Sequence, residues 1–329
     1  MTAARPLVDS YGRVHRDLRI SITDRCNFRC TYCMPAEGMQ WLPRDQILTF
    51  EEIERVARVL VETFGFDGIR LTGGEPTVRA HLPRLVAKLS ALGIDLAMTT
   101  NGAALPLLAH DLRAAGLSRI NVSCDSLRRE RFAEMTRRDE LDRVLAGIDA
   151  AVEAGFDPVK VNVVLVKGVN DDEIVDFAAF GRDRGVEVRF IEFMPLDADH
   201  AWSGNRVVRA EEVVAAIDAV FPLEPVVRGN EPAERFVYRD GGGSVGVIAS
   251  VTRPFCASCD RVRLTAEGQL RTCLFAHHEL DLRALLRGGA SDPDLAAAVE
   301  GAILTKGPGH AIGSETFVQP RRTMSAIGG

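Results

Sequence analysis

The chain has 329 residues, and 40 lysines and arginines against 46 aspartates and glutamates give it a net charge of −6. Its 46% hydrophobic and 26% charged content is that of a folded globular protein and excludes disordered and fibrous chains. The sequence lacks the run of about 18 apolar residues that a membrane span needs. Its first residues also lack the apolar core of a signal peptide. We therefore expect a cytoplasmic protein with no membrane partner and, given its acidic charge, no nucleic-acid partner.

Short β-like runs alternate with amphipathic runs over the first 220 residues. The expected strands cover 18–23, 69–73, 95–100, 119–123, 159–166 and 186–192. The expected helices cover 49–64, 81–91, 104–115, 140–154, 171–184 and 209–220. Thr49, with Glu52 three residues later, predicts a capping box at the start of the first helix. Six β–α units in series predict parallel strands with right-handed crossovers, too few for a closed eight-stranded barrel.

One face of these strands is polar, where the lumen of a packed barrel would carry Val, Ile and Leu. Alternation along each strand places the polar residues on one surface: Arg19, Ser21, Thr23, Arg70, Thr72, Asn121, Ser123, Lys160, Asn162 and Arg189. Four of them are cations, which are costly to bury without a partner. We expect them to converge in a lumen that holds an anionic ligand; the alternative is that some are solvated edge positions.

The pattern changes after about residue 225. Two hairpins are expected, one formed by 235–240 with 245–251 and one by 261–265 with 270–275. Helices are expected over 278–287 and 292–304, and residues 307–329 resemble a loop. The sequence therefore predicts a partial barrel over 1–225 and a β-rich and helical C-terminal region over 226–329.

Six of the seven cysteines form two triplets, which indicates metal ligation rather than a disulfide framework. The first triplet, Cys26, Cys30 and Cys33, has the spacing C-x3-C-x2-C and directly follows the first strand. A [4Fe–4S] cluster takes four cysteines, so three leave one iron open to a small molecule. The alternative is zinc bound by three cysteines and a histidine, but His15 is the closest histidine in sequence.

The second triplet is Cys256, Cys259 and Cys273. Its spacing leaves two interpretations equally open: a second [4Fe–4S] cluster with an open iron, or a zinc site completed by His277 or His278. Arg261 and Arg263, on one face of the strand beside it, favour the cluster, because an anionic substrate needs them and structural zinc does not.

The segment CNFRCTYC, with Tyr32 before its last cysteine, resembles the signature of radical S-adenosylmethionine (SAM) enzymes. A second mark of that superfamily, GGEP at residues 73–76, follows the second strand. The resemblance implies that SAM chelates the open iron of the first cluster. Its cleavage then yields a 5′-deoxyadenosyl radical that abstracts a hydrogen atom from the substrate.

The whole chain is similar to the GTP 3′,8-cyclase family of molybdenum cofactor biosynthesis. The likeness runs through LRISITDRCNFRCTYCMP, IRLTGGEPTVR, MTTNG, INVSCDSL, VKVNVVLVKGVN, RFIEFMP and FCASCDRVRLTAEGQLRTCLF. It implies an incomplete (β/α)6 barrel of the radical SAM type, with a C-terminal extension that carries the second cluster. The implied reaction converts GTP to (8S)-3′,8-cyclo-7,8-dihydroguanosine 5′-triphosphate after hydrogen abstraction from ribose C3′.

The resemblance also implies roles for individual residues. The SAM contacts correspond to Tyr32, Gly74, Ser123 and Met194, and the GTP contacts to Arg19, Arg70, Thr99, Lys160, Arg261 and Arg263. Cys124 replaces the family's usual hydrophobic residue, and we expect it to be a small buried hydrophobe. We expect Arg189 to contact the tail or the triphosphate. The terminal Gly328 and Gly329 are expected to enter the barrel, on their own chain or on a neighbouring chain of a homodimer.

The implied partners are GTP, a reduced flavodoxin or ferredoxin as electron donor, and cyclic pyranopterin monophosphate synthase, which would receive the product. Two other functions stay open at this point. One is another two-cluster radical SAM enzyme, such as a peptide-modifying maturase, although only three cysteines follow residue 124. The other is a non-catalytic iron–sulfur or zinc protein, which would show no SAM binding.

Overall fold

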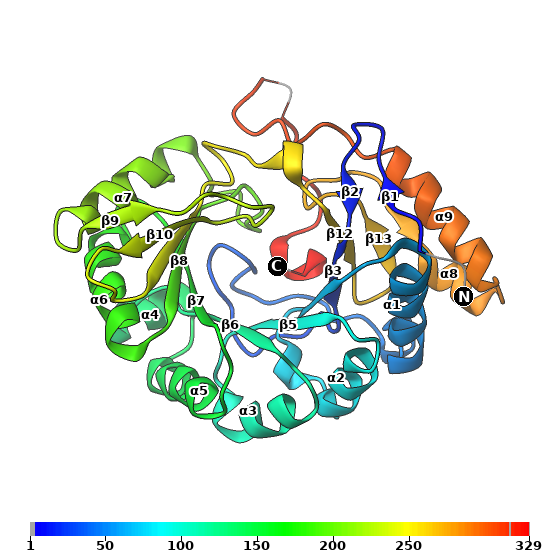
Figure 1. Ribbon diagram of the computed structural model, residues 1–329, viewed down its shortest axis with the longest axis horizontal. Helices are drawn as coiled ribbons and strands as arrows, with labels where there is room; N and C mark the ends of the chain where they lie inside the picture. Colours follow the sequence, from blue (N-terminus) through cyan, green and yellow to red (C-terminus); the bar gives the residue numbers. More distant parts are fainter. Residues whose placement is uncertain (1–3, 316, 329) are drawn as a thin grey trace.

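The computed structural model describes residues 4–315 and 317–328. The predicted open barrel is confirmed. Its parallel strands follow one another in chain order: β3 (Asp17–Ser21), β4 (Gly68–Thr72), β5 (Asp95–Thr100), β6 (Arg119–Ser123), β7 (Val159–Leu165) and β8 (Glu187–Glu192). Figure 1 shows these strands around a central space, with the helices outside.

The crossover helices match the predicted ones: α1 (Phe50–Phe64), α2 (Leu82–Ser90), α3 (Leu105–Ala114), α5 (Leu141–Glu153), α6 (Ile174–Arg184) and α7 (Ala210–Asp218). The capping box of α1 is present, since the Glu52 amide donates to Thr49 Oγ1 at 3.1 Å and the Thr49 amide donates to the Glu52 carboxylate at 2.7 Å. The helix ends at Gly65 in the left-handed conformation, φ 71°, which glycine adopts without strain.

Two helices were not predicted from the sequence. Helix α4 (Arg129–Thr136) is mostly polar and lacks a sustained apolar period. It is fixed by tertiary contacts instead, among them the edge-on packing of Phe132 against Phe28, with ring centroids 6.0 Å apart. The second, α10 (Met324–Ile327), is a single turn within the C-terminal segment that the sequence predicts to be a loop.

The two predicted C-terminal hairpins are present, as β10 (Glu234–Tyr238) with β11 (Ser244–Ile248) and β12 (Arg261–Leu264) with β13 (Gln269–Arg271). They do not form a separate sheet. Strand β11 pairs in parallel with β8, and β12 pairs in parallel with β3, so both edges of the open barrel are continued by C-terminal strands. Short strands β9 (Leu223–Pro225) and β14 (Leu280–Asp281) end the sheet. The boundary at residue 225 stays a prediction, and it does not divide this sheet in two.

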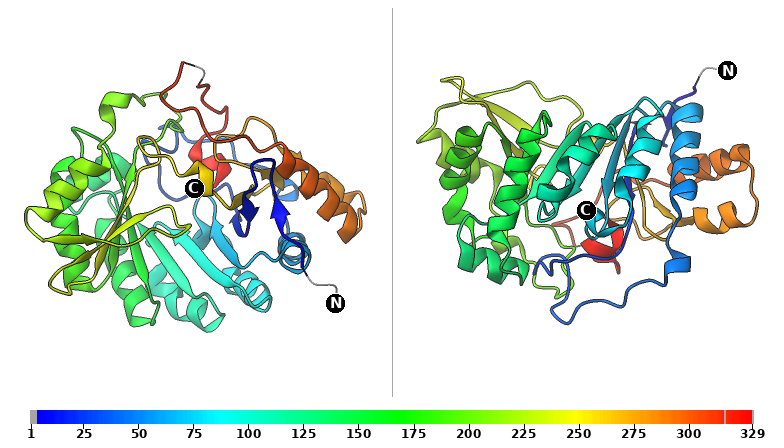
Figure 2. Two further views of the ribbon diagram at one scale, coloured as in Figure 1. Left: turned by 45° about the horizontal axis from the view of Figure 1, so that its top comes forward. Right: turned by 90° about the horizontal axis from the view of Figure 1, so that it is seen from below.

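The remaining elements cover the β12 edge of the barrel (Figure 2). They are the hairpin β1 (Leu7–Val8) with β2 (Val14–His15), and helices α8 (Leu282–Arg287) and α9 (Asp292–Leu304). Arg55 and Arg58 of α1 bind the carboxylate of Asp292 at 2.8 and 2.9 Å, which fastens α9 to α1. Within the described ranges, no helix is long and apolar enough to cross a membrane.

Candidate active site

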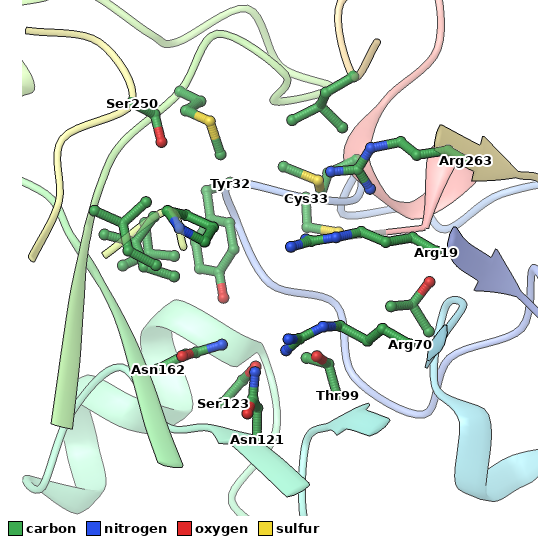
Figure 3. A pocket seen from close by; sticks show the side chains of 18 of the residues that line it. Arg19, Tyr32, Cys33, Arg70, Thr99, Asn121, Ser123, Asn162, Ser250 and Arg263 are labelled. Carbon is green, nitrogen blue, oxygen red and sulfur yellow. The ribbon is translucent and has the colours of Figure 1, made fainter. Parts of the chain in front are cut away.

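A cavity of about 310 Å³ lies inside the barrel, and all six triplet cysteines line it. The first triplet lies on the loop after β3, and the second lies around β12, more than 200 residues later in the sequence. Between them the wall carries most of the polar strand residues singled out from the sequence (Figure 3). They converge on one lumen, as predicted: Arg19, Arg70, Thr72, Asn121, Ser123, Asn162 and Arg189.

The first triplet lies on a compact loop that the protein holds by its backbone. The amides of Cys33 and Met34 both donate to the Cys30 carbonyl, at 2.9 and 3.0 Å, and Arg137 donates to the carbonyls of Arg29 and Met34. Burial raises the pKa of Cys26 to about 11 and that of Cys33 to about 12. All three thiols line one cavity from one short loop, so a cluster could take them as ligands together, and its positive charge would favour their ionisation.

The GGEP segment wraps around the start of the cysteine loop. A side chain at Gly74 would overlap the Arg25 carbonyl oxygen, and the Gly74 amide donates to Thr23 O at 2.7 Å. Glu75 follows, fully buried, and accepts hydrogen bonds from the Thr77 amide, the Thr100 hydroxyl and the Asn101 amide at 2.6–3.0 Å. Burial raises its pKa despite these bonds. A carboxylate held this firmly at the cavity wall suits a cationic ligand group.

The other residues expected at SAM also line the cavity: Tyr32, Gly74, Ser123 and Met194. Tyr32 donates its hydroxyl proton to Asp125 Oδ2 at 2.6 Å, and the Val164 amide donates to Asp125 Oδ1 at 2.8 Å. Burial raises the pKa of Asp125 to about 6. Asp125 was not singled out from the sequence; its position directly after β6, where parallel-strand residues face a site, was the available signal.

The zinc alternative for the second triplet needs His277 or His278 as a fourth ligand. His277 and His278 are exposed and do not line the cavity. The histidine that does line it, His310, packs against Phe275 with ring centroids 5.0 Å apart and ring planes tilted by 58°, and it hydrogen-bonds the Ser250 backbone. Across residues 4–315 and 317–328, no group of three or more His, Cys, Asp or Glu side chains is arranged for a single metal ion.

Three arginines lie side by side between the two triplets. Arg263 of β12 is in register with Arg19 of β3, which is in register with Arg70 of β4. Burial, together with their mutual repulsion, lowers the pKa of Arg19 to about 9, and burial lowers that of Arg70 to about 10. Among the described residues, the Nε atoms of Arg19 and Arg70 have no hydrogen-bond partner. Such an arrangement is costly unless an anion binds there.

Lys160 is the exception among the expected GTP contacts. It does not line this cavity but a second pocket near the start of β7, and its Nζ lies 4.0 Å from Glu187. Thr99, Arg261 and the three arginines in register all line the cavity. Arg189 also reaches it, but its guanidinium is bound by Glu187 at 2.5 Å and Glu231 at 3.0 Å. Its charge is therefore already balanced, unlike that of Arg70.

The C-terminal segment lies inside the barrel, where α10, in red, is at the centre of Figure 1. The carbonyl of Gly328 accepts a hydrogen bond from Arg263 at 2.7 Å. A side chain at Gly328 would lie 2.7 Å from Ser21 Cβ and 2.8 Å from Thr72 Oγ1, and its φ of 84° also favours glycine. Gly329 lies outside the described residues. Cys124 is buried and outside both triplets, as expected of a small hydrophobe.

Comparison with known proteins gives one consistent result. Residues 20–181 match the Radical SAM superfamily, and residues 186–312 match the family described as Molybdenum Cofactor Synthesis C. A GTP 3′,8-cyclase of Mycobacterium sp. (strain KMS) is 51% identical, over 100% of this chain and 95% of its own. A GTP 3′,8-cyclase of Streptomyces coelicolor is 50% identical, over 99% and 97%.

Among solved structures, the fold is similar to that of Streptococcus suis SuiB bound to precursor peptide SuiA. The TM-score is 0.64 at 14% identity, and the match covers 89% of this chain and 67% of SuiB. SuiB bound to S-adenosylmethionine gives a TM-score of 0.58 at 13% identity, over 87% and 68%. At these identities the likeness concerns the fold alone.

Proposed function

The chain belongs to the GTP 3′,8-cyclase family of radical SAM enzymes, and on that basis we propose that GTP and SAM bind together in the cavity between the two cysteine triplets. The protein is a lyase of the molybdenum cofactor pathway that acts on GTP, with SAM and [4Fe–4S] clusters as cofactors. The identity over the full chain favours this function over a peptide-modifying maturase.

One observation carries the assignment of the GTP end of the cavity. The side chains of Arg19 and Arg70 line the lumen (Figure 3), and their buried Nε atoms have no hydrogen-bond partner. Within the described residues no carboxylate lies within 4 Å of the charged groups of Arg70, Arg261 or Arg263. A triphosphate offers several anionic oxygens to these arginines, and each guanidinium group can bind two phosphate oxygens at once. We therefore assign the triphosphate to Arg19, Arg70, Arg261 and Arg263.

The SAM end is assigned to the first triplet and its surroundings. Cys26, Cys30 and Cys33 would hold the first cluster, and Cys256, Cys259 and Cys273 the second. A reduced cluster held by the first triplet would supply the electron that cleaves SAM to methionine and a 5′-deoxyadenosyl radical, and that radical would take the hydrogen atom from ribose C3′. Glu75 offers a fixed carboxylate to the amino group of SAM, and Met194 an apolar surface to its adenine.

The chain's own contribution is alignment. The arginines would hold the triphosphate of GTP, and the second triplet lines the same cavity beside β12, so its cluster could hold the base of the same nucleotide. Ring closure needs C8 of the base beside C3′ of the sugar, and holding reacting atoms in contact contributes much of the rate in such reactions.

The arginine assignment predicts a loss of GTP affinity. Arg261→Ala and Arg263→Ala should each remove a charge-assisted contact worth about 1.5–3 kcal/mol, a roughly tenfold to hundredfold weakening in Kd. From the sequence, the same loss was expected for Lys160→Ala. Its place outside the cavity now predicts a smaller one. Equilibrium dialysis with GTP measures all three, and Arg16→Ala, an exposed arginine at the start of β3, is the control. Unchanged affinity in both Arg261 and Arg263 variants would place the triphosphate elsewhere.

The cluster assignment predicts the metal content. Anaerobically reconstituted protein should hold about eight iron atoms per chain, as two [4Fe–4S] clusters require, and no zinc. Plasma emission spectrometry measures both metals in one sample. About four iron atoms with one zinc would mean that the second triplet is a zinc site, and exposed His277 or His278 would then have to move inward.

Two protein partners follow from the chemistry rather than from any observed interface. We propose that a reduced flavodoxin or ferredoxin supplies the electrons, because each turnover consumes them. We also propose that cyclic pyranopterin monophosphate synthase receives the cyclised nucleotide. We also propose that the enzyme is a homodimer in which the tail of each chain enters the barrel of the same chain, as Gly328 does here.

A further inference from the structure

A buried lysine stands behind the second triplet, on the side away from the cavity. Lys306 follows α9 and is only 4% exposed. Its Nζ lies 3.0 Å from Arg261 O, 3.4 Å from Cys259 O and 3.7 Å from Cys259 Sγ. Across the described part of the chain no carboxylate forms an ion pair with Nζ, and the groups of opposite charge that it faces are the Cys259 and Cys273 sulfurs. A buried ammonium group needs a counter-charge, and the nearest group that can carry one is the Cys259 sulfur.

The N-terminal hairpin fixes the direction of this ammonium group. Asp9 is fully buried at its side chain and accepts hydrogen bonds from Arg13 Nε at 2.5 Å and His15 Nε2 at 3.1 Å. With the Nε2 proton held by Asp9, His15 turns its other nitrogen, Nδ1, toward Lys306 Nζ at 3.4 Å. Burial, followed by the charge of Lys306, lowers the pKa of His15 to about 4, so the ring is neutral and Nδ1 accepts.

The same hairpin also holds the loop around the triplet. Arg13 donates to the carbonyls of Cys256, Gly307 and Pro308 at 2.9, 2.7 and 3.1 Å. At Gly309 the backbone approaches the triplet so closely that a side chain would lie 3.0 Å from Cys256 Sγ. The segment 306–310 is thus an outer wall of the second triplet, and Lys306 is the cation in it.

We propose that Lys306 is a positioning residue for the second cluster: directed by His15 and Asp9, its ammonium group donates to the Cys259 sulfur and stabilises the reduced cluster. Hydrogen bonds to cluster sulfurs and nearby charge set the reduction potential of such centres, and outer residues orient the ligands. One-electron reduction adds negative charge, which a fixed cation favours. Lys306 therefore holds the midpoint potential above the value that the cysteines alone would give. The inference rests on the proposed second cluster.

The test is a redox titration with dithionite as the electron source, followed by electron paramagnetic resonance of the holoenzyme. A full-length chain with Cys26, Cys30 and Cys33 changed to alanine identifies the signal of the second cluster. Lys306→Gln keeps N–H donors for the two carbonyls and removes the charge, Lys306→Met removes both, and Lys306→Arg keeps the charge. Lys167→Gln, at an exposed lysine bound to Glu212, is the matched control.

We expect a shift to more negative potential in Lys306→Gln, a larger one in Lys306→Met, and values near the parent in Lys306→Arg and Lys167→Gln. Iron content and far-ultraviolet circular dichroism show whether each variant is loaded and folded. If Lys306→Met does not fold, Lys306→Gln and Lys306→Arg alone decide. A midpoint in Lys306→Gln equal to that of the parent overturns the proposal. Failure of the proposed function is a separate outcome, because the parent protein would then yield no cyclised GTP whatever the potential.

Discussion

Replacing any cysteine of the first triplet with alanine is expected to abolish SAM cleavage, whereas replacements in the second triplet should uncouple it. Without Cys26, Cys30 or Cys33 the cluster loses one of only three protein ligands, and the electron that cleaves SAM is no longer delivered. Without Cys256, Cys259 or Cys273 the first cluster and the SAM contacts remain intact. GTP is then misaligned, and a misplacement of about 1 Å costs on the order of a hundredfold in rate.

Two products measured together distinguish the triplets. Second-triplet variants should still form 5′-deoxyadenosine while cyclised nucleotide falls at least about a hundredfold; first-triplet variants should form neither. Cys124→Ala is the control, because Cys124 is buried in the hydrophobic core, does not line the cavity, and donates its thiol hydrogen to the Ser126 carbonyl at 3.4 Å. Normal cyclisation in the second-triplet variants would contradict the role assigned to that cluster.

Deleting Gly328 and Gly329 is expected to lower GTP-dependent SAM cleavage while leaving iron content unchanged. Gly328 is the described end of the tail, and its carbonyl accepts a hydrogen bond from Arg263, a residue assigned to the triphosphate. The same segment reaches the first triplet, since Ser325 Oγ lies 3.4 Å from the Cys33 carbonyl. Losing one contact to a charged group predicts a decrease in 5′-deoxyadenosine of at least about tenfold.

The substitution Gly328→Ala tests the same point without shortening the chain. A methyl group there would collide with Ser21 and Thr72, so the tail should be forced out of the lumen. Gly241→Ala is a matched control, because Gly241 also has a positive φ, 80°, but nothing lies within 4 Å of the added carbon. Full activity of the deletion would show that the pair is only a chain end. Partial rescue by a peptide of the last residues would support a direct role.

The barrel could be predicted closely, because each of its strands has a strong local pattern. The expected ranges 95–100 and 119–123 coincide with β5 and β6. The alternation of polar residues also predicted that Arg19 and Arg70 would share a surface, since period-two alternation is a local property of strands. The capping box of α1 was predictable because it too is local, formed by Thr49 and Glu52 three residues apart.

Contacts between distant segments could not be predicted. Nothing near residue 263 indicates that β12 pairs in parallel with β3, yet this pairing puts Arg263 in register with Arg19. Alternation likewise placed Lys160 on the polar face of β7, but it could not predict that this side chain lies beside Glu187 and lines a second pocket. Helix α4, with few apolar residues, depends on packing against the cysteine loop, which no local pattern records.

If one cavity brings GTP to the radical generated beside the first triplet, the hydrogen atom at C3′ must pass to SAM's adenosyl group. The most direct test gives the anaerobically reconstituted enzyme SAM, dithionite and GTP deuterated at C3′, with mass detection of both products. We expect deuterium to appear in 5′-deoxyadenosine and to be lost from a cyclised nucleotide that is distinct from GTP on chromatography. Accumulation of unlabelled 5′-deoxyadenosine with GTP recovered unchanged would contradict it.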